Sequence, residues 1–464
     1  VPPELTRMPL VGAALLVKSL ELGDIATVLS QCPDPPSEAY VVHAIAELKL
    51  VRALDDEQNL TCLGRILARL PVDPHVGLAL LMGHWLFGLG DAMATLCAAM
   101  SFDEPFPYEK TAGYLPRSIA QQFQGSRKNS DQFVLGLVHQ EYARLVETVG
   151  EASANRFVAS EGLHPAIMRQ VYDASEQLRS LLRTDALGAL GLGGAEPLDE
   201  DAIELSSKKR SYTAVRDWGP QEWQWGAILL ALVTALPHLA VHQENRQLWV
   251  EEDVVGMIHK GSVNCCRNYV FPSPVFAFLD QVREGGWRAD RCRQLTNMPP
   301  LLALLKPFTN SEIRLDEEDG KCVLVADWIP LGPVSPDTAH LVLLLRSRLE
   351  DAVVECAEQI SAEGGASFAM EGGLKDKELA TLLQELLRQN NLRFTEPSAN
   401  NGQNGKSGGG KGLGKGKDKG HFAAPSWSGT IPAYTQPPPR PAHVPKAFQK
   451  GSAKSSKGGI DWWS

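Results

Sequence analysis

The chain has 464 residues, of which 44% are hydrophobic and 22% charged, a composition typical of a soluble protein with more than one domain. Its net charge of -10 is unevenly distributed, because residues 400–464 hold ten Lys or Arg against two Asp or Glu. This tail therefore carries +8 and residues 1–399 carry -18. An acidic overall charge consequently does not exclude a nucleic-acid partner, which a basic tail is able to bind.

Eight cysteines are spread thinly along the chain without a CxxC pair, which favours a reducing compartment, either the nucleus or the cytoplasm. The opening VPPELTR lacks the successive charged, apolar and cleavage regions of a signal peptide. Because Val1 stands where Met is expected, the sequence favours a fragment or a processed chain.

Helical periodicity interrupted by turn signals runs through the first 75 residues. An apolar face from Leu10 to Leu20 ends before Gly23, and a second helix is expected at 38–54. The stretch ALDDEQNLT is typical of two short strands around a polar turn, and Thr61 is placed to cap a further helix. Helices, a small hairpin and another helix together predict a winged helix over residues 1–75.

Residues 76–100 are apolar enough to raise the question of a membrane span. Asp91 would lie inside that span at a cost of about 3 kcal/mol near the bilayer centre, and no Lys/Arg cluster flanks it. Gly88, Gly90 and Asp91 more simply divide the segment into two buried helices, so we expect no membrane partner.

Further helical patterns cover 130–148 and 164–183, followed by a Gly- and Leu-rich break at 187–198. These patterns predict an all-helical body over residues 76–205.

From about residue 221 the character changes to that of a mixed α/β unit. A helix is expected in EWQWGAILLALVTAL, and β-branched and aromatic runs predict strands in PHLAVHQ, RQLWVEE, NYVFPSPVFAFL and KCVLVADWIPL. With a long helix at 336–360, these short strands fit an OB-like β-barrel over residues 206–361. Residues 362–464 are rich in Gly, Lys and Pro and are expected to form a largely disordered basic tail. The predicted fold class is therefore α+β and multidomain.

The segment IHKGSVNCC places a cation, a hydroxyl and an amide at alternate positions. Alternation along a barrel strand or its end would bring Lys260, Ser262 and Asn264 together beside His259, where they could contact a phosphate and a sugar. An ordinary polar strand end is the competing interpretation. A metal site is disfavoured, because the adjacent Cys265 and Cys266 would point to opposite faces of a strand.

Motifs for catalysis are weak in this sequence. NNGQNGKS ends like a phosphate-binding P-loop but has Asn400 where the first glycine is required, and no DExH box is present. His238 and His242 are spaced as HxxxH, yet Leu239 stands in place of a catalytic glutamate. We therefore expect no catalytic residue, no bound cofactor and no metal in this chain.

Glycine-spaced lysines in the tail form a flexible polycation that would bind RNA or DNA through counterion release. A solubilising tail is the alternative. The lysines in question are Lys411, Lys415, Lys417 and Lys419.

The order of several long motifs resembles the region that follows the two motor domains of DEAH-box RNA helicases. These motifs are LTRMPLVGAALLVKSLELGDIATVLSQCPDPP, LTCLGRILARLPVDPHVG and GDAMATLCAAMSFDEPF. IHKGSVNCC, FPSPVFAF and VLVADWIPL resemble the RNA helicase A (maleless) branch in particular.

This resemblance implies a winged helix, a helical ratchet domain and an OB-fold that close over the motor and line the path of single-stranded RNA. It implies RNA contacts from His259 and Lys260, with Ser262 and Asn264 in the same loop and Thr296 as a matching threonine. Gly261 departs from the Ser or Thr of the family and Pro299 departs near Thr296, which puts those contacts in question. The tail has Lys where the family has Arg, so it should stack less on bases.

Two functions compete at this point. The chain is either the accessory region of an ATP-dependent RNA helicase, whose ATP- and magnesium-binding motor domains are its missing partners, or a standalone RNA-binding or scaffold protein without motor activity. Single-stranded or partly duplex RNA, or DNA, is the expected partner in both. A reading frame extending upstream into P-loop and DEAH motifs would favour the first, and an in-frame start just before Val1 the second.

Overall fold

The computed structural model describes the chain from its N-terminal helices to a long helix that ends at residue 363. The described residues are 5, 9–106, 129–182, 223–243, 245–251, 254–265, 271–282, 290–309, 311–316, 321–326 and 328–363. All of them belong to one unit, Val1–Pro425, and the second unit, Ser426–Ser464, lies outside them. The basic tail, with its four candidate lysines, also lies outside the described residues.

Four helices form the N-terminal part: α1 (Val11–Ser19), α2 (Ile25–Ser30), α3 (Glu38–Leu50) and α4 (Cys62–Leu67). The predicted cap is confirmed, since the Thr61 hydroxyl accepts a hydrogen bond from the Gly64 amide at 2.9 Å. The two short strands predicted before it are wrong. Only an isolated bridge joins Leu54 to Leu60, because Asp55 closes the turn through its side chain on Asn59. The winged-helix assignment stays a prediction.

The helical body contains α5 (Pro74–Trp85), α6 (Gly90–Met100), α8 (Asp131–Thr148), α9 (Glu151–Glu161) and α10 (Pro165–Leu182). The division of residues 76–100 into two buried helices is confirmed, with a break at Gly88, whose φ is +65°. Within the described part of the chain, no helix combines the length and the apolar character needed to cross a bilayer.

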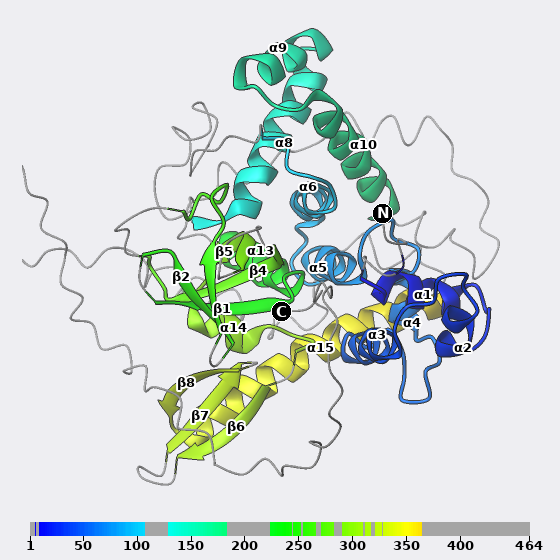
Figure 1. Ribbon diagram of the computed structural model, residues 1–464, viewed down its shortest axis with the longest axis vertical. Helices are drawn as coiled ribbons and strands as arrows, with labels where there is room; N and C mark the ends of the chain where they lie inside the picture. The colour runs from blue at the N-terminus through cyan, green and yellow to red at the C-terminus, as the bar shows by residue number, and fades with distance from the viewer. Residues whose placement is uncertain are drawn as a thin grey trace, which may run out of the picture. The chain divides into compact units, whose positions relative to one another are not determined.

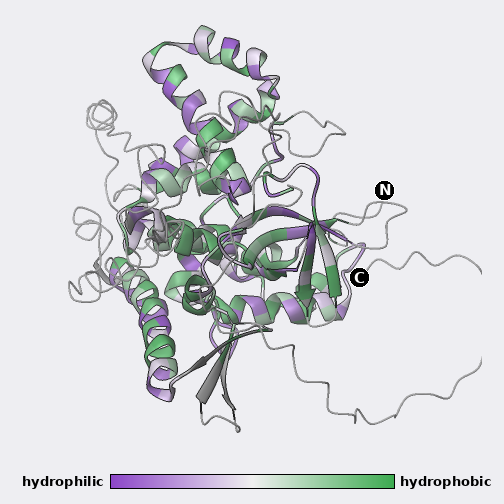
Figure 2. Ribbon diagram, turned by 90° about the vertical axis from the view of Figure 1, so that its left-hand side faces the viewer, coloured by the Kyte–Doolittle hydropathy of each residue, from purple (hydrophilic) through white to green (hydrophobic). Residues whose placement is uncertain are grey.

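Helix α10 shows how an amphipathic sequence selects its packing face. Its buried residues recur three or four positions apart, at Met168, Val171, Ser175, Leu178 and Leu182, and α10 contacts α6 and α8. Hydrophilic and hydrophobic colours alternate along the helices at the top of Figure 2 for the same reason.

Helix α13 (Trp223–Thr234) joins the helical body to the β-structure. It contacts α5 on one side and α14 (Pro300–Leu305) on another, and Trp225 stacks on Phe133 of α8 with ring centroids 3.9 Å apart. Ile228, Leu230 and Leu232 are fully buried, so the continuous apolar run predicted as a helix is a core helix.

Five strands close into a barrel in the order β1-β2-β3-β5-β4. They are β1 (His238–His242), β2 (Gln247–Glu251), β3 (Val254–Ile258), β4 (Val275–Val282) and β5 (Arg291–Asn297). The β3–β5 pairing is parallel and the other pairings are antiparallel. Side chains such as Leu248, Ile258, Phe276 and Phe278 fill the interior. This closed barrel is consistent with the predicted OB-like fold.

A separate three-stranded sheet contains β6 (Ser311–Asp316), β7 (Lys321–Ala326) and β8 (Ile329–Val334). Placing the KCVLVADWIPL strands in the barrel was therefore wrong, because β7 and β8 pair with each other and with β6. The barrel takes β3 and β5 instead: β5 (RCRQLTN) is polar in composition, and β3 (VVGMI) is short and interrupted by Gly256.

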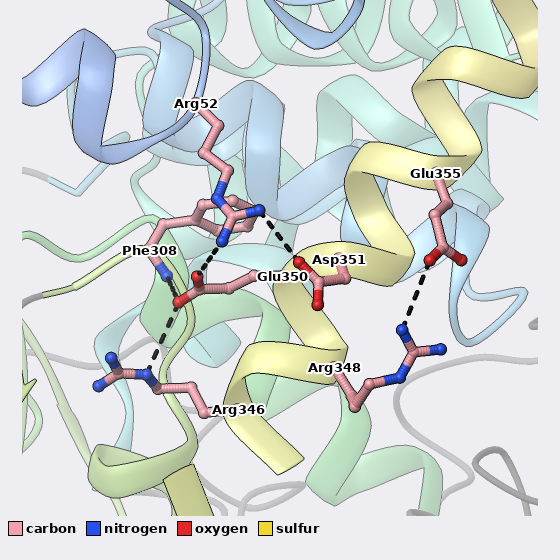
Figure 3. A network of polar contacts seen from close by, with 7 residues as sticks. All are labelled: Arg52, Phe308, Arg346, Arg348, Glu350, Asp351 and Glu355. Atoms are coloured by element: carbon pink, nitrogen blue, oxygen red, sulfur yellow. Dashed lines mark hydrogen bonds and ion pairs between the residues drawn. The ribbon is translucent and has the colours of Figure 1, made fainter. Parts of the chain in front are cut away.

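The long helix predicted at 336–360 is confirmed as α15 (Pro336–Glu363), which contacts α4 and α5 as well as α14 and β7 (Figure 1). Polar contacts fix it to distant parts of the chain, as Figure 3 shows. Arg52 pairs with Glu350 at 3.2 Å and with Asp351 at 3.1 Å, and Glu350 also accepts the Phe308 amide at 2.8 Å. The N-terminal helices and the segment after α14 are thus held to the same turn of α15.

Gly64 is expected to be irreplaceable in α4. An added Cβ would lie 2.1 Å from the carbonyl oxygen of Ala53, a backbone atom that cannot rotate away. We expect Gly64→Ala to lower the free energy of unfolding by about 1–3 kcal/mol, measured by urea denaturation. Gly12→Ala is the matched control, because its Cβ would approach nothing closer than 4.0 Å in α1 and should stabilise the chain by about 0.5–1 kcal/mol. Equal effects of the two substitutions would contradict this packing.

Candidate nucleic-acid interface

Residues 259–265 follow the end of β3 and form two successive turns. The His259 amide donates to the Cys292 carbonyl at 2.9 Å, the Ser262 amide donates to His259 at 3.1 Å, and the Cys265 amide donates to Ser262 at 3.0 Å. Strand alternation therefore does not apply here, and the prediction that positions 260, 262 and 264 share one strand face is wrong. We call residues 259–265 the barrel-end loop.

The inner half of the barrel-end loop, residues 262–265, is largely buried and hydrogen-bonded within the protein. Ser262 is 4% exposed and Asn264 is 1% exposed. The Ser262 hydroxyl accepts the Asn264 amide at 3.1 Å, and the side-chain amide of Asn264 donates to the Leu295 carbonyl at 3.0 Å. Asn264 therefore fastens the loop to β5, and Ser262 stabilises the turn within the loop. The predicted contact of both side chains with RNA stays a prediction.

Asp131, the first residue of α8, is the acceptor at the centre of this region. Its Oδ1 accepts the Val263 amide at 2.8 Å and its Oδ2 accepts the Leu295 amide at 2.8 Å. Burial raises the pKa of Asp131 to about 7, and the carboxylate of Glu104 adds to the increase, whereas the hydrogen bonds from Ser262, Leu295 and Val263 oppose it. One carboxyl group thus joins helix α8, the barrel-end loop and strand β5.

Thr296 lies on the other side of the same junction and is fully buried. Its hydroxyl is 2.6 Å from the Ser130 hydroxyl and donates to Oε1 of Gln132. Ser130 is also the N-cap of α8, where it accepts the Phe133 amide. In this structure Thr296 positions the start of a helix, and its predicted role as an RNA contact stays a prediction.

The outer half of the barrel-end loop, residues 259–261, contains the two predicted RNA-contacting side chains that are accessible to solvent. His259 and Lys260 are both partly exposed. Nδ1 of His259 accepts the Gly261 amide at 3.1 Å, and a Cβ at Gly261 would lie 3.2 Å from that nitrogen. Glycine at this position therefore leaves room for the close approach of the His259 ring.

The cysteines near the loop show no metal geometry in the part of the chain that the structure describes. Cys265 and Cys292 are buried, and burial raises the pKa of Cys292 to about 12, which disfavours the thiolate that a metal requires. Among the described residues, no group of three or more His, Cys, Asp or Glu side chains could hold a metal ion. Cys266 lies outside the described residues.

Sequence comparison finds relatives of this chain among known helicases. The chain is 28% identical over 375 residues to the DExH-box ATP-dependent RNA helicase DExH4, chloroplastic, of Arabidopsis thaliana. The aligned region covers 76% of this chain and 26% of that helicase. Over 104 residues it is 47% identical to the ATP-dependent DNA/RNA helicase DHX36 of Rattus norvegicus, covering 22% of this chain and 10% of that protein.

The chain is homologous to DExH-box RNA helicases. A third relative, the DExH-box ATP-dependent RNA helicase DExH3 of Arabidopsis thaliana, is 40% identical over 135 residues, which are 29% of this chain and 11% of that helicase. No protein-family model matches the chain. The predicted resemblance to the helicases is thus confirmed, whereas the assignment to the RNA helicase A branch stays a prediction. The chain spans about a quarter of the length of DExH4 and about a tenth of the other two relatives.

Sequence reasoning missed the residues of α8 that support the site. Ser130, Asp131 and Gln132 precede an apolar helical run, and this Ser-Asp-Gln series is a recognisable helix start. The sequence therefore carried a signal for the cap. Nothing local in it indicated that the same three side chains would bind a loop and a strand more than 130 residues away.

Asp131 makes a testable contribution to the pH dependence of stability. Because its pKa rises from 3.8 to about 7 on folding, the folded chain binds this proton more tightly, and stability should fall as pH rises from about 4 to about 7. In Asp131→Asn this component disappears, and a side-chain NH₂ facing a backbone amide lowers stability at every pH. Urea midpoints at pH 5 and pH 8 measure both effects.

Asp34→Asn is the control, because Asp34 is exposed and lies in the N-terminal part. It should retain the wild-type difference between the two midpoints. A difference in Asp131→Asn as large as that of the wild type would show that Asp131 does not titrate in this range.

Proposed function

We propose that this chain is an accessory region of an ATP-dependent RNA helicase and that it binds single-stranded RNA through the outer half of the barrel-end loop. The observation that carries the proposal is the division of that loop into a buried, hydrogen-bonded inner half and a partly exposed His259–Lys260 pair. Homology to DExH-box RNA helicases supports the choice of RNA as the ligand.

The geometry suits contact with a sugar–phosphate backbone. Lys260 supplies a positive charge on a flexible stem, and His259 supplies a partly exposed ring whose Nδ1 accepts the Gly261 amide. Because the inner half of the loop is fastened at Asp131 and Leu295, the pair is held in place before RNA arrives. Backbone contacts of this kind bind many sequences with similar affinity.

The activity of the whole helicase is a further part of the proposal, since the chain matches only a fraction of its relatives' length. In this proposal the motor domains of the parent protein bind ATP and Mg²⁺, and this chain binds the strand that the motor moves. Partly duplex RNA or DNA would enter by the same backbone contacts. The nucleus or the cytoplasm is the proposed location, and the lysines at 411, 415, 417 and 419 would add a salt-sensitive, sequence-independent contribution.

Lys260→Ala should weaken RNA binding and reduce its salt dependence. The measurement is fluorescence anisotropy of a labelled oligouridylate with the full chain, in a background where Lys411, Lys415, Lys417 and Lys419 are changed to Gln. Loss of one phosphate contact should lower the slope of log affinity against log salt by about 0.7 unit, the value per charge on a single strand.

Lys18→Ala removes the same charge from α1 and is the matched control, expected to leave the slope unchanged. If both substitutions change the slope equally, the binding reflects overall charge and the barrel-end loop is not the site. An unchanged slope in Lys260→Ala would likewise contradict the proposal.

A further inference from the structure

Arg246 stands at the same end of the barrel as the barrel-end loop. Its carbonyl accepts the amide of Ile258 at 2.9 Å, so Arg246 lies directly across the ladder from the residue that precedes His259. Side chains alternate along β2, with Leu248 and Val250 buried inside the barrel. Arg246, which directly precedes β2, therefore lies on the same inward-facing side of the strand as Leu248 and Val250.

The guanidinium of Arg246 is incompletely satisfied. Its Nε is buried without a hydrogen-bond partner, and no carboxylate within the described part of the chain pairs with it. The residue as a whole is nevertheless partly exposed, so an external group can reach the rest of the guanidinium. A buried donor without a partner lowers stability, and such a donor in a native protein calls for an explanation.

The turn that carries Arg246 is held in a fixed shape. Nε2 of His242 donates to the Asn245 carbonyl at 3.3 Å, and Asn245 adopts a φ of +55°, a conformation that asparagine tolerates. The His242 ring packs edge-to-face on Phe271 at 4.9 Å, and Phe271 packs on Phe276 at 4.9 Å. The backbone around Arg246 is thus ordered without a partner for the guanidinium.

An anion supplied from outside can reach the accessible nitrogens of this guanidinium, although not its buried Nε. A guanidinium presents planar donors that match two oxygens of a phosphate, and such charge-assisted pairs are strong where water is partly excluded. We propose that Arg246 binds an RNA phosphodiester adjacent to the one at Lys260, so that the strand crosses from the barrel-end loop to the β1–β2 turn. This inference rests on the RNA binding proposed above and extends the site by one nucleotide contact.

The test compares Arg246→Gln and Arg246→Lys in the full chain with the four tail lysines changed to Gln, using the same labelled oligouridylate and salt series. Arg246→Gln should weaken binding about tenfold, the loss of one charged hydrogen-bonded contact. It should also lower the salt slope by about 0.7 unit. Arg246→Lys should keep the slope and lose part of the affinity, because an ammonium cannot bind two oxygens in one plane.

Thermal unfolding separates ligand binding from a structural role. Because Arg246 has no ion-pair partner among the described residues, Arg246→Gln should unfold at a temperature no lower than the wild type. Arg156→Gln is the matched control, an exposed arginine on α9 whose removal should change neither affinity nor slope. A competition arm adds inorganic phosphate at constant ionic strength, which should displace little RNA if the site recognises a strand.

Each outcome has one meaning. Normal binding by Arg246→Gln together with weakened binding by Lys260→Ala would overturn this inference and leave the proposed function standing. Weakened binding accompanied by a lower unfolding temperature would assign Arg246 a structural role and also overturn it. Complete displacement of RNA by inorganic phosphate would assign the site to the free anion. Absence of RNA binding by the chain with the four tail lysines changed to Gln would overturn both proposals.

Discussion

The carboxyl group of Asp131 is buried at the start of α8. Its hydrogen bonds are the constraint on which the attachment of the barrel to the helical body depends. Both of its oxygens accept backbone amides from the β-structure, one from the barrel-end loop and one from β5. Without the carboxyl group, two buried amides would lose their partner, at roughly 1–3 kcal/mol each. Because α8 packs on α6 and α9, this carboxyl group and the neighbouring Ser130 and Gln132 join the barrel to the helical body.

The junction at α15 is a different kind of contact. Arg52 pairs with Glu350 and Asp351, but its side chain is 42% exposed, and exposed ion pairs contribute only about 0–1 kcal/mol. The buried Phe308 and the apolar contacts of α15 with α4 and α14 therefore supply most of the stabilisation there. At α15 one carboxylate, that of Glu350, accepts one buried backbone amide, whereas at the start of α8 the single carboxyl group of Asp131 accepts two.

Local patterns in the sequence predicted local structure well. The Thr61 cap, the pair of helices in residues 76–100, the core helix α13 and the long helix α15 each depend on spacing within a few turns. The strands of β7 and β8 were also recognisable, but their membership of a separate sheet depends on pairing with β6, which no short pattern encodes. For the same reason the burial of Ser262 and Asn264 was not predictable, since their partners come from α8 and β5.

Residue type alone did not separate ligand-binding side chains from structural ones at the end of the barrel. Ser262, Asn264 and Thr296 have the chemistry of RNA contacts, yet each is at most 4% exposed and hydrogen-bonded within the protein. Asn264 does retain one oxygen without a partner among the described residues, but at 1% exposure no ligand reaches it.

Arg246 differs because part of its guanidinium is accessible and, among the described residues, no carboxylate pairs with it. A polar side chain whose hydrogen bonds are all made within the protein gains little free energy from a ligand. A group that is both held in place and left incomplete gains free energy only when a partner arrives, and this condition identifies Arg246 beside the His259–Lys260 pair.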